Sequence, residues 1–181
     1  MSLFDKMVKP ILLYGCEIWG FGNNDVLEKV HLKFCKMILN LKTSTPNYMI
    51  YGELGRYPVE IDIKIRIISF WAKIICGKQS KRSCIMYKSH HLYSQQNFDI
   101  KWINFLEKIL NETGFSNIWQ TQTYKSIEWL KQSIKQTLLD QFFYRIGIRQ
   151  SIIPLKHLII KFSKLILNLK NILIFSKKKI F

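Results

Sequence analysis

Carboxylates, the side chains that most often perform acid–base or metal chemistry, are few in this chain and lie apart from one another. The 181 residues include 12 Asp and Glu, and these are scattered singly apart from Glu60 and Asp62. Both share a predicted helix with Lys64 and Arg66, so we expect a solvated charge cluster in which each ion pair contributes little to stability. There is no nucleophile elbow, no glycine-rich phosphate loop and no adjacent aspartate pair of the kind that holds polymerase metals. The sequence therefore predicts no catalytic site.

Cysteine and histidine spacing also argues against a metal centre. No two of the four cysteines have CxxC spacing, which predicts free thiols in a reducing compartment. His90 and His91 are adjacent, so they point to different faces of any helix or strand and cannot ligate one ion as an i, i+4 pair can. We therefore expect ordinary surface or half-buried histidines, and neither a zinc site nor any other cofactor.

The charge balance favours a polyanionic partner. Lys and Arg number 28 against 12 acids, a formal net charge of +16. Such a surplus attracts nucleic acid or an anionic membrane face. Because 23 of the 28 basic residues are Lys, we expect a general electrostatic attraction to the partner's negative charge and no recognition of particular bases. The alternative is a biased gene, since the chain has 28 Ile but a single Ala, Ala72.

The clearest helix signal follows Asn23 and Asn24, either of which can serve as N-cap. Apolar residues then recur at spacings of three and four, which predicts an amphipathic helix whose inner face carries Leu27, Val30, Phe34, Ile38 and Leu41. Lys29, Lys33 and Lys36 fall on the wet side of this helix. A shorter helix is expected after Thr45 and Pro46, ending at Gly55.

The stretch from Val59 to Ile67 alternates apolar and polar residues, as a strand does. The unbroken run from Pro58 to Cys76 is nevertheless far longer than a usual strand, and we predict a helix ended by Gly77. Residues 78–83 are expected to form a loop, followed by a short helix over 84–93 with Ile85, Met86 and Leu92 turned inward.

Two more amphipathic helices complete the expected body. Asp99 can cap the first, which closes at Gly114, and the second begins near Tyr124. The inward positions predicted for these helices are Trp102, Ile103, Leu106, Ile109, Leu110, Ile127, Leu130, Ile134 and Leu138. Tryptophans beside Ile and Leu at helical spacing are expected in the core, namely Trp71, Trp102 and Trp129. The predicted fold is all-α: an irregular bundle of amphipathic helices with a basic C-terminal helical tail.

The composition changes after Asp140, where the last 41 residues contain no Asp or Glu. On a helical wheel, residues from Leu155 to Leu173 place an apolar arc opposite Lys161, Lys164 and Asn168. We therefore divide the chain into a body, residues 1–142, and a divergent basic amphipathic tail, residues 143–181. The tail could lie on an anionic membrane surface or dock on a partner, although its lysines exclude a membrane span. It could equally cover the body's own core, or be accidental sequence from an A/T-rich reading frame.

Several segments, taken in order, carry a resemblance to a known family. The first is VKPILLYGCEIW at residues 8–19. The others are FCKMILNLK (34–42), TPNYMIYGELGRYP (45–58), the IKIRIISFWAKI segment, KWINFLEKILNETGFSNIW (101–119) and WLKQSIKQTLLDQF, which ends at Phe142. Together they extend over about three quarters of the chain and resemble the C-terminal part of LINE-type (non-LTR) retrotransposon endonuclease–reverse transcriptase polyproteins. The family pattern implies a helical thumb or post-thumb region that supports a template–primer duplex and binds RNA.

This resemblance, together with the basic surplus, implies a nucleic-acid-binding role without catalysis. The metal-binding aspartates of the polymerase palm have no counterpart here, so we expect a truncated, non-enzymatic fragment inside the cell, in cytoplasm or nucleus. The expected contacts to an RNA or DNA backbone are Lys29, Lys33, Lys36, Lys42, Lys78, Lys81 and Arg82. No small-molecule substrate is inferred. The rival hypothesis is a helical protein-interaction module, or a degenerate product, with no nucleic-acid role.

Overall fold

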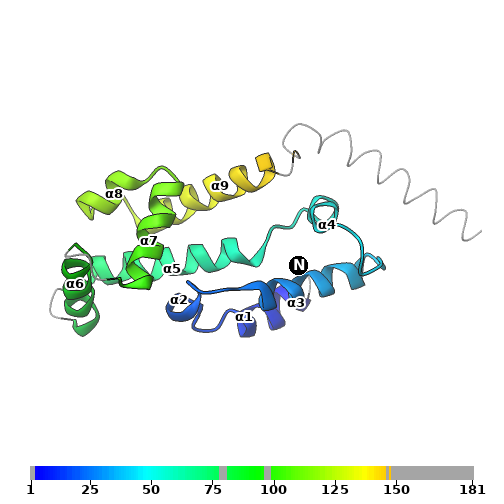
Figure 1. Cartoon of the computed structure of the whole chain (residues 1–181), viewed down its shortest axis with the longest axis horizontal. Coiled ribbons are helices and arrows are strands. Elements are labelled where there is room, and N and C mark those ends of the chain that lie inside the picture. The colour runs from blue at the N-terminus through cyan, green and yellow to red at the C-terminus, as the bar shows by residue number, and fades with distance from the viewer. Residues whose placement is uncertain (1–2, 78–80, 96–98, 146, 148–181) are drawn as a thin grey trace, which may run out of the picture.

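The structure, a computed structural model, describes residues 3–77, 81–95, 99–145 and 147. Within these residues every regular element is helical, which confirms the predicted all-α fold (Figure 1). In chain order the elements are the π-helix η1 (Phe4–Val8) and the helices α1 (Lys9–Leu12), α2 (Cys16–Trp19), α3 (Asp25–Ile38), α4 (Asn47–Leu54), α5 (Val59–Cys76), α6 (Arg82–Gln95), α7 (Lys101–Glu112), α8 (Ser116–Thr121) and α9 (Ile127–Arg145). None of these helices is both long and apolar enough to cross a bilayer.

Helix α5 is the axis around which the other elements pack. Neighbouring helical residues are rotated by about 100°, so side chains two positions apart point to nearly opposite faces. The alternation from Val59 to Ile67, which would give a strand one apolar face, therefore spreads apolar residues over most of the circumference of this helix and leaves a polar strip with Asp62 and Arg66. Its buried residues are Val59, Ile61, Ile63, Ile65, Ile67, Ile68, Trp71 and Ala72. A helix of this kind has to be covered by others over most of its surface.

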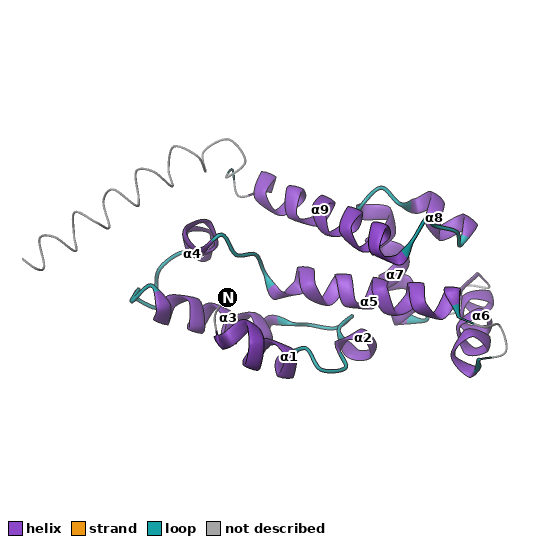
Figure 2. Ribbon diagram, turned by 180° about the vertical axis from the view of Figure 1, so that it is seen from behind, coloured by secondary structure: helices purple, strands orange, loops and turns teal. Residues whose placement is uncertain are grey.

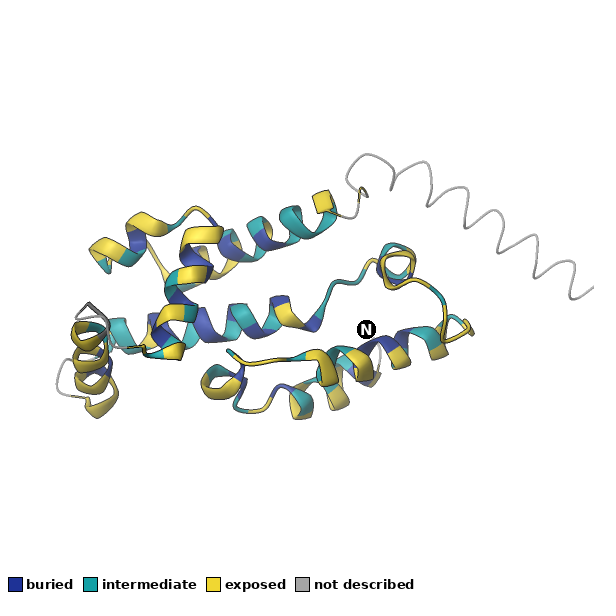
Figure 3. Ribbon diagram, viewed as in Figure 1, coloured by how far each residue is buried: buried dark blue, intermediate teal, exposed yellow. Residues whose placement is uncertain are grey.

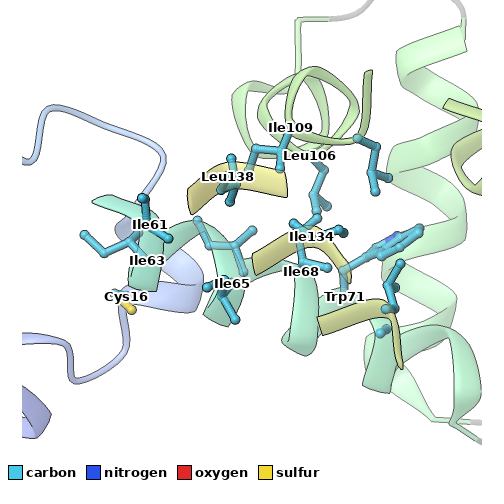
Figure 4. Packing of buried hydrophobic residues seen from close by; sticks show 14 of the residues in the cluster. Cys16, Ile61, Ile63, Ile65, Ile68, Trp71, Leu106, Ile109, Ile134 and Leu138 are labelled. Carbon is cyan, nitrogen blue, oxygen red and sulfur yellow. The ribbon is translucent and has the colours of Figure 1, made fainter. Parts of the chain in front are cut away.

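Helices α7 and α9 enclose one side of α5. Figure 2 shows α9 running beside α5, and the two helices are in extensive contact. In Figure 4, Ile134 and Leu138 from α9 lie beside the α5 isoleucines, and Leu106 of α7 reaches the same cluster. The predicted inward positions Leu130, Ile134 and Leu138 of α9 are all buried. The predicted α7 positions Ile103, Leu106, Ile109 and Leu110 are also buried.

Helix α2 packs against another part of α5 at very close range. Cys16 of α2 and Ile63 of α5 are both fully buried in the main core. A methyl group built on Gly20, just after α2, would collide with Cγ2 of Ile63 and lie 2.5 Å from the carbonyl oxygen of Cys16. Only a residue without a side chain allows this approach, so the packing of the N-terminal segment on α5 depends on Gly20.

A second, smaller cluster lies between α3 and α4 and is joined to the main core through Phe142 of α9. Its buried members are Leu32, Cys35, Ile50 and Tyr51. The Phe142 ring packs edge-on against Tyr51, with 5.6 Å between ring centroids, and also contacts the main core. Helix α9 runs on to Arg145, so the predicted boundary between residues 142 and 143 falls inside a helix. The tail from residue 148 onward lies outside the described residues.

The buried face of α3 differs from the predicted one. Val30, Ile38 and Leu41 are exposed, and α3 ends at Ile38. Its buried residues are His31, Leu32 and Cys35. Leu27 and Phe34 of the predicted stripe are half-buried against the core clusters, so the prediction was right for these two and wrong for the other three. It failed because the face toward the core is partly polar: Glu28 and His31 take part in interactions with α4, α5 and η1, as detailed below.

The orientation of α6 was also predicted wrongly. Ile85, Met86 and Leu92 are exposed, while Cys84 and Tyr87 are buried. Figure 3 shows α6 with much of its surface in the exposed class. The Tyr87 hydroxyl donates a 2.8 Å hydrogen bond to Oε1 of Gln122, which fixes the side of α6 that faces the body. Helix α6 begins at Arg82, inside the stretch expected to be a loop.

The tryptophan predictions were correct for Trp71 but not for Trp129. Trp71 is fully buried, and Trp102 is half-buried with its Nε1 donating a 2.9 Å hydrogen bond to the carbonyl oxygen of Glu17. Trp129 is 39% exposed and touches Phe115 edge-on. The segment around Trp119, between the two helices predicted to end at Gly114 and to begin near Tyr124, forms α8.

We predict that Gly20→Ala destabilises the protein by about 1–3 kcal/mol, because the added methyl forces α2 away from Ile63. Urea unfolding followed by circular dichroism measures the change. Gly22→Ala is the matched control, since its methyl would meet only the carbonyl oxygen of Trp19 at 3.9 Å. Equal stability of the two variants would contradict the close packing of α2 on α5.

Candidate nucleic-acid interface

Three of the seven predicted contact residues line one groove on the surface of α3. Lys29, Lys33 and Lys36 recur at spacings of four and three, which places them along one face of a helix. The groove has a volume of about 550 Å³ and lies between α3 and the segment leading to α4. Its remaining lining is Leu32, Met37, Leu41, Thr43 and Asn47. It therefore combines basic walls with a partly apolar floor.

The lysines of this groove are not equivalent. The Nζ atom of Lys36 donates a hydrogen bond to the carbonyl oxygen of Thr43 at 2.5 Å, which ties the end of α3 to the following loop. Lys29 and Lys33 are exposed, and neither has a carboxylate partner among the residues that the structure describes. Lys42 is exposed on the same loop, between the lining residues Leu41 and Thr43. Lys29 and Lys33 are thus the cations most available to an anion.

The other predicted contacts lie elsewhere. Lys81 and Arg82 are exposed at the start of α6, and Figure 1 places α6 and the far end of α3 toward opposite ends of the long axis of the molecule. Arg82 is the first residue of a helix rather than part of a loop, which corrects the prediction. Lys78 lies outside the described residues. The structure therefore groups the α3 lysines and separates them from Lys81 and Arg82.

Glu28, on the turn of α3 before the groove, fixes this helix to two others. Its Oε2 atom accepts a 2.7 Å hydrogen bond from the backbone N–H of Val59, the first residue of α5. The N–H groups at a helix start have no partner within the helix, and a carboxylate there also meets the positive end of the helix dipole. The Oε1 atom accepts a hydrogen bond from the Tyr51 hydroxyl of α4. Glu28 therefore sets the position of α3 relative to α4 and α5.

His31 lies one turn further along α3 and is 2% exposed, so it is more buried than the surface or half-buried position that was predicted. Its ring stacks on Phe4, with 5.7 Å between centroids. Nδ1 lies 3.7 Å from Oε1 of Glu28, and Nε2 lies 3.4 Å from Nη1 of Arg56. Burial on its own lowers the pKa of His31, but the neighbouring Cys35 side chain and Glu28 carboxylate outweigh burial and raise the pKa to about 9.

Arg56 connects the same region to the N-terminal segment. Its Nη1 and Nη2 atoms donate to the two carboxylate oxygens of Asp5 at 2.9 and 2.6 Å. This paired geometry is the strong form of an arginine–carboxylate contact, and it raises the pKa of Arg56. The Arg56 guanidinium also lies 5.7 Å from the centre of the Phe34 ring. Helix α3 is thereby held against η1 as well as α4 and α5.

Of the two acids of α5, Glu60 is exposed, as the predicted solvated cluster implies, whereas Asp62 makes contacts with other parts of the fold. Glu60 pairs with Lys64 within the helix at 2.7 Å. Asp62 pairs with Lys9 of α1 at 2.5 Å and accepts a hydrogen bond from the Tyr57 hydroxyl at 3.2 Å. The prediction was wrong for Asp62 because its partner Lys9 is distant in the chain. The sequence alone does not reveal that α1 packs against this face of α5.

Metal-ligating side chains do not converge in the part of the chain that the structure describes. It contains no group of three or more His, Cys, Asp or Glu that could hold an ion. The four cysteines are free, as predicted; Cys16, Cys35 and Cys84 are buried, whereas Cys76 is exposed. The Sγ atom of Cys76 lies 2.8 Å from the Tyr124 hydroxyl. What the geometry offers is therefore a set of cations beside a shallow groove.

Sequence reasoning located the groove lysines but missed the interactions that hold them in position. The i, i+4, i+7 spacing of the lysines was visible in the sequence. The roles of Glu28 and Arg56 were not, because their partners lie 23 to 51 residues away in the chain. Only the position of Glu28 in the first turn of α3 was visible, and there it indicated a helix start rather than a contact with another helix.

We predict that stability declines as the pH rises from about 6.5 to about 9. The pKa of His31 is higher in the folded state than its ordinary value of 6.5, so its contribution is complete below pH 6.5 and is lost as the pH passes 9. The loss is at most on the order of 3 kcal/mol. Urea unfolding at pH 6 and pH 9.5 measures this loss of stability.

Two variants test the assignment to His31. His31→Gln should remove this part of the pH dependence, and His90→Gln, at an exposed position, should keep it. The same pH dependence in His31→Gln and wild type would contradict the assignment.

Comparisons with known proteins give this geometry no counterpart. No family model, no curated protein and no solved structure matches the chain. The function has therefore to be argued from the groove, its lysines and the sequence motifs.

Proposed function

We propose that this chain binds the backbone of RNA or DNA, without catalysing a reaction, through the α3 groove. The observation that carries the proposal is the alignment of Lys29, Lys33 and Lys36 along one groove. Lysines in such a row neutralise successive phosphates and release the counterions condensed on the strand. The net charge of +16 adds long-range attraction for a polyanion.

The composition of the groove supports binding that does not depend on base sequence. Its cations are lysines, which act as point charges, and it contains no arginine to form a paired contact with guanine. No aromatic ring is among the described residues that line the groove, so bases have no ring to stack on there. Leu32, Met37 and Leu41 supply apolar surface against which the lysine stems and sugar groups can pack.

The proposed origin of this activity is the thumb or post-thumb region of a LINE-type reverse transcriptase. The ordered motifs from VKPILLYGCEIW at residues 8–19 to the segment ending at Phe142 support this origin. A helical thumb-like region with a basic helix facing outward would contact the strands that the polymerase handles. Both the origin and the location inside the cell are part of the same proposal.

A protein-interaction role is the second candidate, favoured by exposed apolar residues on the N-terminal helices. Ile11, Tyr14 and Ile18 are 75%, 83% and 67% exposed. Exposed apolar side chains of this size close together in the chain are typical of a surface that a partner covers. This candidate assigns the lysines no function, so binding to an oligonucleotide discriminates the two.

We predict that the protein binds a fluorescent single-stranded oligonucleotide at 50 mM salt and that its affinity falls steeply as salt is added. For the double variant Lys29→Gln/Lys33→Gln, the slope of log affinity against log salt should fall by about 1.4, the loss of two phosphate contacts. Fluorescence anisotropy over a salt series measures both quantities. Mixed-sequence and homopolymer strands should bind with similar affinity.

The matched variant is Lys81→Gln/Arg82→Gln, which removes the same charge at the start of α6. Its effect on affinity should be clearly smaller than that of the α3 variant. Equal losses in the two variants would mean that binding follows net charge and would overturn the role of the groove. Salt-insensitive binding, or none at 50 mM salt, would overturn nucleic-acid binding itself.

A further inference from the structure

We propose that a hollow between α1, α5 and α9, separate from the α3 groove, is a binding site for a phosphate group. The hollow has a volume of about 240 Å³, which is ample for an oxyanion of that size and its first waters. Its charged lining residues are Lys9, Arg66, Lys131, Lys135, Asp5 and Asp62. None of them lines the α3 groove. Four elements, η1, α1, α5 and α9, therefore bring four cations and two carboxylates together.

The carboxylates around the hollow are already matched by cations. Asp62 pairs with Lys9 at 2.5 Å. Asp5 is held by both terminal nitrogens of Arg56. Positive charge therefore exceeds negative charge at the hollow once these pairs are counted.

Arg66 adds a planar donor group at the edge of this hollow. Its Nη1 atom lies 3.6 Å from Oε1 of Glu17 and donates a 3.3 Å hydrogen bond to the carbonyl oxygen of Leu13. The carbonyl bond holds the guanidinium at the boundary between α1 and α5. A guanidinium has five N–H donors, so Arg66 keeps donors that these two acceptors do not use.

The surplus charge comes from Lys131 and Lys135 of α9. They are four residues apart and lie on the same face of the helix, where like charges repel. In the part of the chain that the structure describes, neither has a carboxylate partner. Lys131 is exposed and Lys135 is half-buried. An anion bound between them would turn this repulsion into attraction.

The Tyr57 ring lies beside two of these ammonium groups. The Nζ atoms of Lys9 and Lys135 each lie 5.5 Å from the ring centre. A cation near an aromatic face is attracted by the ring but keeps its N–H donors free for another acceptor. Tyr57 thus positions Lys135 at the hollow without neutralising it.

These groups fit a phosphate better than a carboxylate. A phosphate carries up to two negative charges, which would balance Lys131 and Lys135, and it offers oxygens to ammonium and guanidinium donors on several sides. Its binding would join α9 to α1 and α5 and would stabilise the folded state. The phosphate could be a free ion or belong to a nucleic-acid strand, and the experiment below separates these sources.

Thermal unfolding of the full chain in inorganic phosphate, against chloride at equal ionic strength, tests the site. We expect saturating phosphate to raise the unfolding midpoint of the wild type by roughly 2–4 °C. The variant Lys131→Gln/Lys135→Gln should lose this rise. The matched variant Lys101→Gln/Lys125→Gln, which removes the same charge at exposed positions away from the hollow, should keep it. No rise in the wild type, or an equal rise in both double variants, would overturn the proposal.

Oligonucleotide affinity of the same variants identifies the source of the phosphate. If Lys131→Gln/Lys135→Gln loses the phosphate response and also binds a single strand more weakly than Lys101→Gln/Lys125→Gln does, the site holds a strand phosphate. If it loses the response but binds the strand as the control does, the site holds a free phosphate. The variant Lys29→Gln/Lys33→Gln should keep the phosphate response, so failure of the α3 groove and failure of this hollow can be told apart.

Discussion

The fold depends on the burial of a single helix that is apolar over most of its circumference. An ordinary amphipathic helix can leave half of its surface in water, but α5 cannot, because its buried residues are spread too widely around it. The main contacts of α5 satisfy this constraint: α9 and α7 cover it from one side, and α2 reaches it through Gly20. Two charged residues of α5 find partners in the N-terminal segment, Lys9 for Asp62 and Glu17 for Arg66.

The candidate interface depends on the same helix through Glu28. The carboxylate that accepts the first N–H of α5 belongs to α3, the helix that carries the groove lysines. Tyr51 connects Glu28 to α4. Arg56, which lies beside His31, connects the same region to η1. The lysine row is therefore displayed on a helix fixed at its inner face by hydrogen bonds, an arrangement that keeps the spacing of its cations constant.

Much of this could be predicted from the sequence, and the failures share a physical cause. The length of the run from Pro58 to Cys76 outweighed its strand-like alternation, and Leu130, Ile134 and Leu138 were correctly assigned to the core. Prediction failed for helix faces that are buried but carry polar side chains. The inner face of α3 carries His31, and α6 turns inward the hydroxyl-bearing Tyr87 instead of Ile85. Hydrophobic periodicity cannot detect a buried helix face whose polar groups form hydrogen bonds with distant residues. It also does not predict that α1, α5 and α9 meet around Tyr57.

Hydrogen exchange with and without a single-stranded oligonucleotide tests most directly the proposal that an α3 groove on a rigid α5 core binds a nucleic-acid strand. In the free protein the amides of α5 should exchange most slowly, because that helix contributes the most residues to the buried core. Adding the strand should slow exchange across residues 29–43 and leave α5 and the start of α6 unchanged. Fast exchange in α5, or protection that appears at residues 81–82 and not along α3, would contradict the account.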